Sequence, residues 1–255
     1  MNFKLTYLFW VLAATGMFAA CGKADSKSPQ LPELTETFSK KDKNPFGGFI
    51  AYQQVKELYR SNMVRDKRLP FTKTWEAISD TAALYICVAP ALFVNEEEVD
   101  AMLEYVEDGN DLFISARYID ENLLKRINCK TKTSFNLREL QNTNTRSLIE
   151  PESPYSYFYY PFNNYFLEID TGKTRVVGNN EEKLPNSIVY FHGKGKMYLQ
   201  CDPRAFSNYF LLKDSNYRYL QHSLAFTAIT PQHVYWDDYY NKLRYRKKDK
   251  NERVF

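Results

Sequence analysis

This chain of 255 residues contains little glycine and has no large excess of charge of either sign. With only 9 glycines, against 20 tyrosines and 18 phenylalanines, the composition excludes a flexible, low-complexity chain. The formal net charge of +3 is too small to indicate a nucleic-acid partner. Hydrophobic residues at 44% and charged residues at 25% are instead typical of a globular protein with a packed core, at a length that fits one large domain.

Metal-ligand spacings are missing as well. Beyond the N-terminal region the chain has three cysteines, Cys87, Cys129 and Cys201, and their spacing fits no metal site. Because their number is odd, they cannot all be paired. A Cys129–Cys201 disulfide is one alternative, whereas Cys87 lies in an apolar run and is expected to be a small buried hydrophobe. We therefore expect neither a metal nor a cofactor.

The N-terminal region predicts a targeting segment. Residues 1–20 carry Lys4 and an apolar run too short for a membrane span, and they end in FAA directly before Cys21. Small residues before a cysteine mark a bacterial lipoprotein signal, so we expect lipidation of Cys21, with ordinary secretion as the alternative. Several acyl chains on one residue would anchor the chain stably in a membrane, facing the periplasm or the cell exterior. Residues 21–34 would then form a polar tether.

A βαβ unit is the strongest structural pattern in the chain. Residues 82–89 and 111–116 are continuous apolar runs typical of strands buried on both faces. Residues 96–108 between them predict a helix with a capping box from Asn95 and Glu98. Four apolar residues at helical spacing should face the sheet: Val99, Met102, Leu103 and Val106.

The rest of the domain, residues 35–240, is expected to mix helices with a β-rich insertion at about residues 130–190. GFIAYQQVKELYR predicts a helix with Ile50 or Ala51, Val55, Leu58 and Tyr59 near one face. The aromatic-rich run SPYSYFYYPFNNYFLEI favours strands whose aromatic side chains pack on each other, and an exposed carbohydrate platform is the alternative. Residues 241–255 form a basic C-terminal tail.

The stretch YFHGKGKMYLQ is not a phosphate-binding P-loop. Gly193 and Gly195 are too close together, Lys196 is followed by Met197, and a strand pattern follows where a P-loop has a helix. The glycines therefore predict a hairpin turn. The second strand of this hairpin leads into CDPRAF, where Asp202 is well placed to cap a helix that begins at Pro203.

Two further elements complete the expected domain. Residues 217–229 predict a helix capped by Asn216, and HVYWDDYY predicts a last strand that ends in Asp237 and Asp238. In open α/β sheets, ligands bind outside the carboxyl ends of the strands. Asp202 and Asp237 should therefore share one crevice, with Trp236 packed beneath it and Asp238 as the more exposed acid.

Three blocks of the sequence carry a family resemblance. NPFGGFIAYQQVKELY, GKGKMYLQCDPRAFSNYFLL and VYWDDYYN resemble, in order, the conserved blocks of the domain-of-unknown-function family DUF4350, over about residues 44–240. The resemblance implies an α/β fold that is flavodoxin-like and related to class I glutamine amidotransferases. That fold is a three-layer sandwich with a mostly parallel sheet, here with the β-rich aromatic insertion.

The resemblance also implies a biological setting. Members are common in Bacteroidetes as membrane- or lipid-anchored chains, in gene neighbourhoods with MoxR-type ATPases and von Willebrand-type membrane proteins, which are the expected partners. Relatives commonly continue into a transmembrane helix. This chain stops at Phe255 after its basic tail, so either the lipid is its only anchor or it is a shortened member.

Amidotransferase chemistry needs a cysteine on a tight strand-to-helix elbow and a His-x-Glu pair. The candidate elbow is Ser115-Ala116-Arg117, without cysteine or glycine, and no histidine has a glutamate two residues later. We expect a non-catalytic module that binds a protein or a small ligand. The alternative is an envelope hydrolase that acts on glycan or amide substrates through acidic residues. The candidate crevice residues are Ser115, Arg117, Asp202, Asn208, Asp237 and Asp238.

Overall fold

The structure is a computed structural model that describes residues 33–76, 81–133, 143–149, 155–157, 164–227 and 230–243. The chain divides into two units, residues 1–32 and residues 33–255, and everything described belongs to the second unit. The predicted signal segment, Cys21 and nearly all of the tether and basic tail therefore lie outside the described residues.

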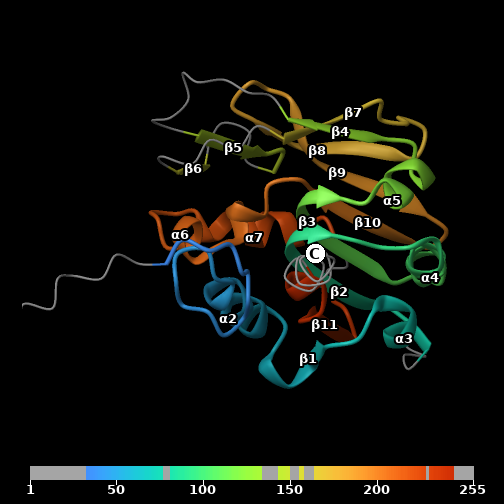
Figure 1. The fold of residues 1–255 in the computed structure, drawn as a ribbon, viewed down its shortest axis with the longest axis horizontal. Helices are drawn as coiled ribbons and strands as arrows, with labels where there is room; N and C mark the ends of the chain where they lie inside the picture. The colour runs from blue at the N-terminus through green and yellow to red at the C-terminus, as the bar shows by residue number, and fades with distance from the viewer. Residues whose placement is uncertain are drawn as a thin grey trace, which may run out of the picture. The chain divides into compact units, whose positions relative to one another are not determined.

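Within the described part of the chain, nine strands form one sheet in the order β1-β11-β2-β3-β10-β9-β8-β5-β6 (Figure 1). The first five of these strands run parallel to one another. Their bounds are β1 (Val64–Lys67), β11 (His233–Asp237), β2 (Ala83–Leu92), β3 (Asp111–Ile119) and β10 (Gly195–Gln200). We call these five strands the parallel half.

The other half of the sheet is antiparallel throughout. It consists of β9 (Pro185–His192), β8 (Thr174–Asn180), β5 (Thr143–Ser147) and β6 (Tyr155–Tyr157). A separate two-stranded ribbon pairs β4 (Lys130–Thr133) with β7 (Asn164–Leu167). The expectation of a mostly parallel sheet is therefore wrong, because the predicted insertion extends the same sheet through the β9–β10 hairpin and makes half of the neighbouring pairs antiparallel.

Helices cover both faces of the parallel half. One face carries α2 (Phe49–Leu58), α6 (Asn208–Leu211) and α7 (Tyr217–Leu224), and the other carries α3 (Phe71–Glu76), α4 (Glu96–Glu107) and α5 (Glu121–Arg126). Short 3₁₀ turns are η1 (Ser61–Met63), η3 (Pro203–Phe206) and η4 (Tyr240–Lys242). Successive residues of β2 belong to opposite cores, Leu84 and Ile86 to one and Tyr85 and Cys87 to the other. This alternation is what a strand buried on both faces requires.

The predicted βαβ unit is confirmed. Strands β2 and β3 are parallel neighbours, with Leu84 opposite Asp111, and α4 connects them. Asn95 and Glu98 form both hydrogen bonds of the capping box, at 2.8 and 3.1 Å. The four apolar residues predicted to face the sheet are all buried: Val99, Met102, Leu103 and Val106.

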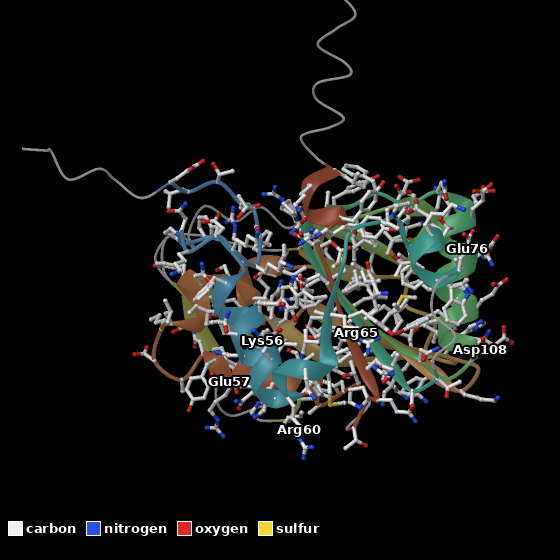
Figure 2. The ribbon with its side chains drawn as sticks, turned by 90° about the horizontal axis from the view of Figure 1, so that it is seen from below. Lys56, Glu57, Arg60, Arg65, Glu76 and Asp108 are labelled. Atoms are coloured by element: carbon white, nitrogen blue, oxygen red, sulfur yellow. The ribbon has the colours of Figure 1, made fainter. Side chains whose placement is uncertain are left out.

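The first predicted helix is present as α2, but one of its face residues was misassigned. Ala51 and Val55 are buried, whereas Leu58 is 45% exposed. Leu58 is the last residue of the helix, and Tyr59, one position further around the helical turn, packs against the core instead. Glu57 and Arg60 point outward at this end of the helix (Figure 2).

The described part of the aromatic insertion supports the packing interpretation. Tyr155 in β6 is buried, and its ring centroid lies 5.3 Å from that of Tyr219 on α7. Phe166 in β7 is buried as well. Residues 158–163 lie outside the described residues.

The glycines of YFHGKGKMYLQ form the predicted hairpin turn. Gly193 has a φ of +57°, a backbone conformation that residues other than glycine disfavour. A Cβ on Gly195 would lie 2.1 Å from the carbonyl oxygen of Asn110, so the hairpin also needs glycine there to approach the α4–β3 loop. Both glycines are explained by backbone geometry alone.

Candidate functional site

The predicted site residues follow the carboxyl ends of strands in the parallel half. Gln200 lies opposite Ser115 in the β10–β3 pairing, and Lys67 lies opposite Asp237 in the β1–β11 pairing. We call this side of the sheet the carboxyl edge. Strands β10 and β11 are separated by β3 and β2, so at about 4.8 Å per strand Asp202 and Asp237 follow strand ends about 14 Å apart. The expectation that both line one crevice is therefore wrong: the sequence did not reveal the two intervening strands.

Ser115 and Asp202 are held in a buried network around Gln200. Ser115 Oγ donates a hydrogen bond to Gln200 Oε1 at 2.6 Å, and the backbone N–H of Asp202 donates to the same oxygen at 2.9 Å. All three side chains are buried. Ser115 therefore lies inside the fold, inaccessible to a substrate.

Asp202 precedes η3 as predicted, with Pro203 in the first turn, but its side chain makes no capping hydrogen bond. The predicted cap is wrong, because the turn that follows is a 3₁₀ turn of 4 residues instead of an α-helix. Asn216 before α7 makes no capping hydrogen bond either, although α7 is an α-helix. Its amide donates instead to the carbonyl oxygen of Ser156 in β6, at 2.8 Å.

Asn208 at the start of α6 ties down the segment of residues 38–48, which we call the strap. Its Nδ2 donates to the carbonyl oxygens of Asp42 and Asn44, at 2.8 and 2.7 Å, and its Oδ1 accepts from the N–H of Ile50 at 2.8 Å. The amide thus reaches the neighbouring loop, as expected. All of these contacts are structural.

Asp237 is buried at the end of β11. Its carboxylate accepts hydrogen bonds from the hydroxyl of Tyr85 at 2.8 Å and from the backbone N–H of Tyr240 at 2.9 Å. Burial raises the pKa of Asp237 to about 7, although these hydrogen bonds oppose the shift. Burial, and then the nearby Asp237 charge, raise the pKa of Cys87 well above its usual range, so this thiol stays protonated.

Asp238 is buried, with 6% of its surface exposed, so the prediction of an exposed acid is wrong. Its backbone N–H donates to the carbonyl oxygen of Lys67 at 2.7 Å, which keeps it in the sheet. Its carboxylate forms an ion pair with Lys242 at 2.9 Å and lies 3.6 Å from Arg68. Adjacent strand residues point to opposite faces, so Asp237 and Asp238 do not form one carboxylate pair.

Arg117 belongs to a cluster around Glu36 that sequence reasoning missed. Arg117 and Arg204 both form ion pairs with the buried carboxylate of Glu36. The partners are 81 and 168 residues from Glu36 along the chain, so no local pattern could have indicated the contact. The predicted tether ended at residue 34, two positions before Glu36.

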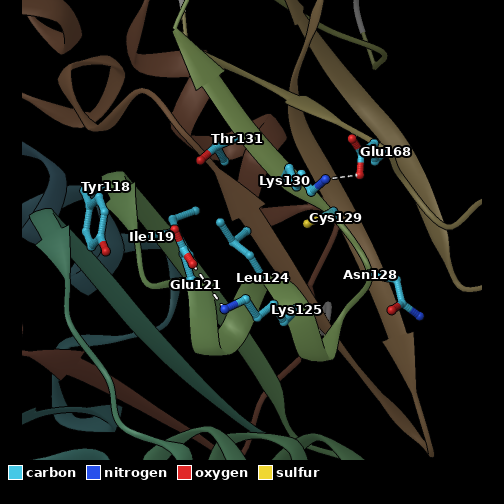
Figure 3. A pocket seen from close by; sticks show the side chains of 10 residues that line it. All are labelled: Tyr118, Ile119, Glu121, Leu124, Lys125, Asn128, Cys129, Lys130, Thr131 and Glu168. Atoms are coloured by element: carbon cyan, nitrogen blue, oxygen red, sulfur yellow. Dashed lines mark ion pairs between the residues drawn. The ribbon is translucent and has the colours of Figure 1, made fainter.

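A pocket of about 650 Å³ lies at the carboxyl end of β3, between α5 and the β4–β7 ribbon (Figure 3). Ile119, Leu124 and Cys129 supply its buried apolar part. Two ion pairs lie along its sides, Glu121 with Lys125 at 3.2 Å and Lys130 with Glu168 at 2.6 Å. The sequence had no signal for this pocket, because its walls come from separate elements.

Aromatic side chains lie next to this pocket. Tyr118, which lines it, is 45% exposed, and its ring centroid lies 5.1 Å from that of Phe93, at the carboxyl end of the neighbouring strand β2. Burial raises the pKa of the Cys129 thiol to about 12, so this cysteine is no nucleophile at neutral pH. The arrangement suits a ligand with an apolar face and a polar rim.

The described cysteines, and two of the histidines, are in structural contacts or buried. Cys87, Cys129 and Cys201 are all free and buried, so the disulfide left open above does not form. His222 Nδ1 lies 2.9 Å from the hydroxyl of Tyr155, and His192 Nε2 lies 4.0 Å from the carboxylate of Glu107. Among the residues that the structure describes, no three acidic, histidine or cysteine side chains are grouped as a metal site.

Within the residues that the structure describes, the helices are all too short or too polar to cross a membrane.

Comparison with family models gives a match to the family described as "Domain of unknown function (DUF4350)" over residues 41–224. No curated protein matches the chain.

Several solved structures are similar in fold. The mmIFT52 N-terminal domain is 14% identical, with a TM-score of 0.48, over 68% of this chain and 87% of that one. Cytoplasmic Protein STM1381 from Salmonella typhimurium LT2 is 10% identical, with a TM-score of 0.43, over 69% and 86%.

An exo-beta-1,4-mannosidase, Op5Man5 from Opitutaceae bacterium strain TAV5, is 14% identical, with a TM-score of 0.40. The match covers 58% of this chain and 25% of that one, so the chain spans about a quarter of the mannosidase's length. These TM-scores are all below 0.5, and the likenesses carry no argument about function.

Proposed function

The chain belongs to the family described as a domain of unknown function, DUF4350, and from that premise we propose that it is a non-catalytic binding module, anchored by a lipid in the bacterial cell envelope. Its ligand, a protein or a small molecule, would bind at the carboxyl edge of the parallel half. The anchor would be Cys21, on the protein's periplasmic or exterior side of a membrane, as in lipoproteins of Bacteroidetes. Membrane proteins of a MoxR-type ATPase cluster are the proposed partners.

One observation carries the non-catalytic part of this proposal. Four of the polar side chains predicted to form the site are buried and engaged by the chain itself: Ser115 by Gln200, Asn208 by the strap, Asp237 by Tyr85 and Asp238 by Lys242. A hydrolase would need at least one acid and one base that reach a substrate. The same burial of Asp202 and Asp237 weighs against the alternative of a glycan or amide hydrolase.

The path of β3 supports the same proposal. In an amidotransferase-like scaffold, the nucleophile sits on a sharp turn directly after the strand. Here Ser115, Ala116 and Arg117 remain in extended conformation inside β3, which continues to Ile119. We propose that the parallel half, with helices on both faces, is a scaffold of the flavodoxin-like, amidotransferase-like type in which this turn is absent.

The pocket beside Tyr118 is the proposed ligand contact. It is the described feature of this edge that combines a cavity, an exposed aromatic ring and hydrogen-bonding side chains. Aromatic residues are enriched in binding surfaces because they bury a large area at a small entropy cost.

Site-specific photo-crosslinking tests the proposal with a matched pair of positions. A photoreactive phenylalanine would replace either Tyr118, 45% exposed at the carboxyl edge, or Phe191, 48% exposed near the opposite ends of the strands. In intact membranes we expect position 118 to give a discrete crosslinked species and position 191 to give none. Equal crosslinking from both positions, or none from position 118, would reject the carboxyl edge as the binding face.

A further inference from the structure

Glu36 occupies a site formed by two arginines at the carboxyl edge. Arg204 Nε donates to Glu36 Oε1 at 2.6 Å, and its Nη2 forms an ion pair with the same oxygen. Arg117 Nη2 lies 3.1 Å from Glu36 Oε2. Arg117 is in β3 and Arg204 is in η3, just after β10, so two neighbouring strands place a guanidinium each where open α/β sheets bind ligands.

The carboxylate of Glu36 fits this site imperfectly. The hydrogen bond from Arg117 Nη1 to Oε1 is long, at 3.5 Å, and Oε2 is buried without a hydrogen-bond donor in the described part of the chain. An arginine fork ordinarily takes both oxygens of a carboxylate in two parallel hydrogen bonds. Glu36 thus gives Arg117 one long hydrogen bond and an ion pair without an aligned hydrogen bond at Oε2, whereas a free carboxylate could align both of its oxygens with the fork.

The side chain of Arg204 and the backbone of Arg117 have contacts that do not involve Glu36. The Arg204 guanidinium lies over the ring of Phe46, 5.4 Å from its centroid, and its carbonyl oxygen accepts a hydrogen bond from Ser207 Oγ at 2.7 Å. The carbonyl oxygen of Arg117 accepts from Asn164 Nδ2 at 2.8 Å. These contacts keep Arg204 and the backbone of Arg117 in place when the occupant leaves. The Arg117 side chain is 35% exposed, so a ligand can reach it from solvent.

Glu36 is also the part of its segment that can leave most readily. It is the first buried residue of the described chain, since Glu33 and Leu34 are exposed and Thr35 is partly exposed. Among the described residues, backbone hydrogen bonds of this segment begin at Thr37, and the strap after it is held by Asn208. Release of residues 33–36 therefore leaves the strap, and Phe46 within it, in place.

We propose that Arg117 and Arg204 form a carboxylate-binding site that Glu36 closes from within, and that a carboxylate ligand binds by displacing Glu36. This inference rests on the proposed function, because it names the chemical class of a ligand for the same edge. The ligand's carboxylate is that of a small organic acid or of a peptide's carboxyl end.

Acetate titration of the full chain in detergent tests this inference. Acetate would replace chloride at constant ionic strength, with the midpoint of thermal unfolding as the readout. We expect acetate to raise the midpoint of Glu36→Ala at concentrations roughly tenfold below those needed for the unchanged chain, because the internal competitor is gone. Glu36→Gln, which keeps the shape of the side chain, should shift the response in the same direction and serves if the alanine variant does not fold.

Two controls address the arginines. Arg117→Gln combined with Glu36→Ala should lose the acetate response, and Arg117→Lys, which keeps the charge but not the fork, should lose most of it. An equal response to acetate and chloride, or an acetate response that persists in the Arg117→Gln double variant, would overturn the proposal.

Tri-alanine with a free or an amidated carboxyl end separates the two sources of the carboxylate. Tighter binding of the free-acid peptide than of acetate indicates a peptide end, and equal or weaker binding indicates a small acid. The titration needs no natural ligand. If acetate does not bind but position 118 forms a crosslink, the carboxylate site alone is rejected. If acetate binds but position 118 forms no crosslink, the proposed function is rejected as stated.

Discussion

Asp237 gives the clearest prediction at the scale of single residues. Burial raises its pKa from 3.8 in the unfolded chain to about 7 in the folded protein. The folded state thus binds the proton more tightly, and the stabilisation is fully present below about pH 4 and is lost as the pH rises through 7. At about 1.4 kcal/mol per pH unit, the free energy of unfolding should fall by up to about 4 kcal/mol over this window.

Asp237→Asn should remove this pH dependence. The amide keeps an acceptor for the backbone N–H groups of Tyr239 and Tyr240, at 3.3 and 2.9 Å, and carries no charge to desolvate. We expect the variant to exceed the unchanged protein in free energy of unfolding by about 1–3 kcal/mol at pH 8. Chemical denaturation from pH 4 to 8 checks this, with Asp238→Asn as the control that keeps the fall. Parallel pH profiles for Asp237→Asn and the unchanged protein would contradict the assignment.

A second prediction for a single residue concerns the contribution of Asn208 to stability. Asn208→Ala removes three hydrogen bonds, two to the strap and one to Ile50 in α2, so we expect a loss of about 2–4 kcal/mol in the free energy of unfolding. Asn208→Asp keeps the acceptor for Ile50 but turns a carboxylate oxygen toward the carbonyls of Asp42 and Asn44. It should therefore be at least as destabilising as alanine, and an aspartate variant as stable as the unchanged protein would show that the amide is oriented differently.

At the scale of elements, α4 offers the sharpest test of packing. Met102→Asp places a carboxylate between the helix and the sheet, where Met102 is fully buried, and should cost several kcal/mol, on the order of 3–5. Glu104→Ala on the exposed face of the same helix is the control and should change stability by less than about 0.5 kcal/mol. Denaturant unfolding of both variants measures the difference, and equal effects would show that the helix faces are misassigned.

Elements whose signals are local could be predicted from the sequence. The α4 helix carries its cap, its apolar stripe and Gly109 within one window, and the β9–β10 hairpin carries its glycines in the turn. What failed depended on distant contacts. The order β11-β2-β3-β10, which separates Asp202 from Asp237, and the pairing of Glu36 with Arg117 and Arg204 arise only when segments far apart in the chain meet. The capping assignments for Asp202 and Asn216 failed because a favourable residue type does not ensure that the side chain bonds to its own turn.

At the scale of the whole molecule, the anchor is a prediction that rests on the sequence alone. Residues FAA before Cys21 indicate lipidation, so Cys21→Ser should abolish incorporation of labelled fatty acid. Metabolic labelling of cells that express either form measures this, with Cys129→Ser as the control that keeps the label. Labelling that persists in Cys21→Ser would contradict lipidation at Cys21, and an unchanged chain without label would leave ordinary secretion as the explanation of the N-terminal segment.

The central claim is that the carboxyl edge is the face that binds, and hydrogen exchange of the full chain tests it most directly. Exchange would be compared between the chain in native membranes and the same chain purified in detergent, without knowledge of the ligand. The account predicts slower exchange in membranes at residues 38–48, 92–95 and 117–131, and unchanged exchange at residues 109–111 and 191–196 at the opposite edge. Protection confined to residues 191–196, or equal exchange at both edges in the two settings, would contradict it.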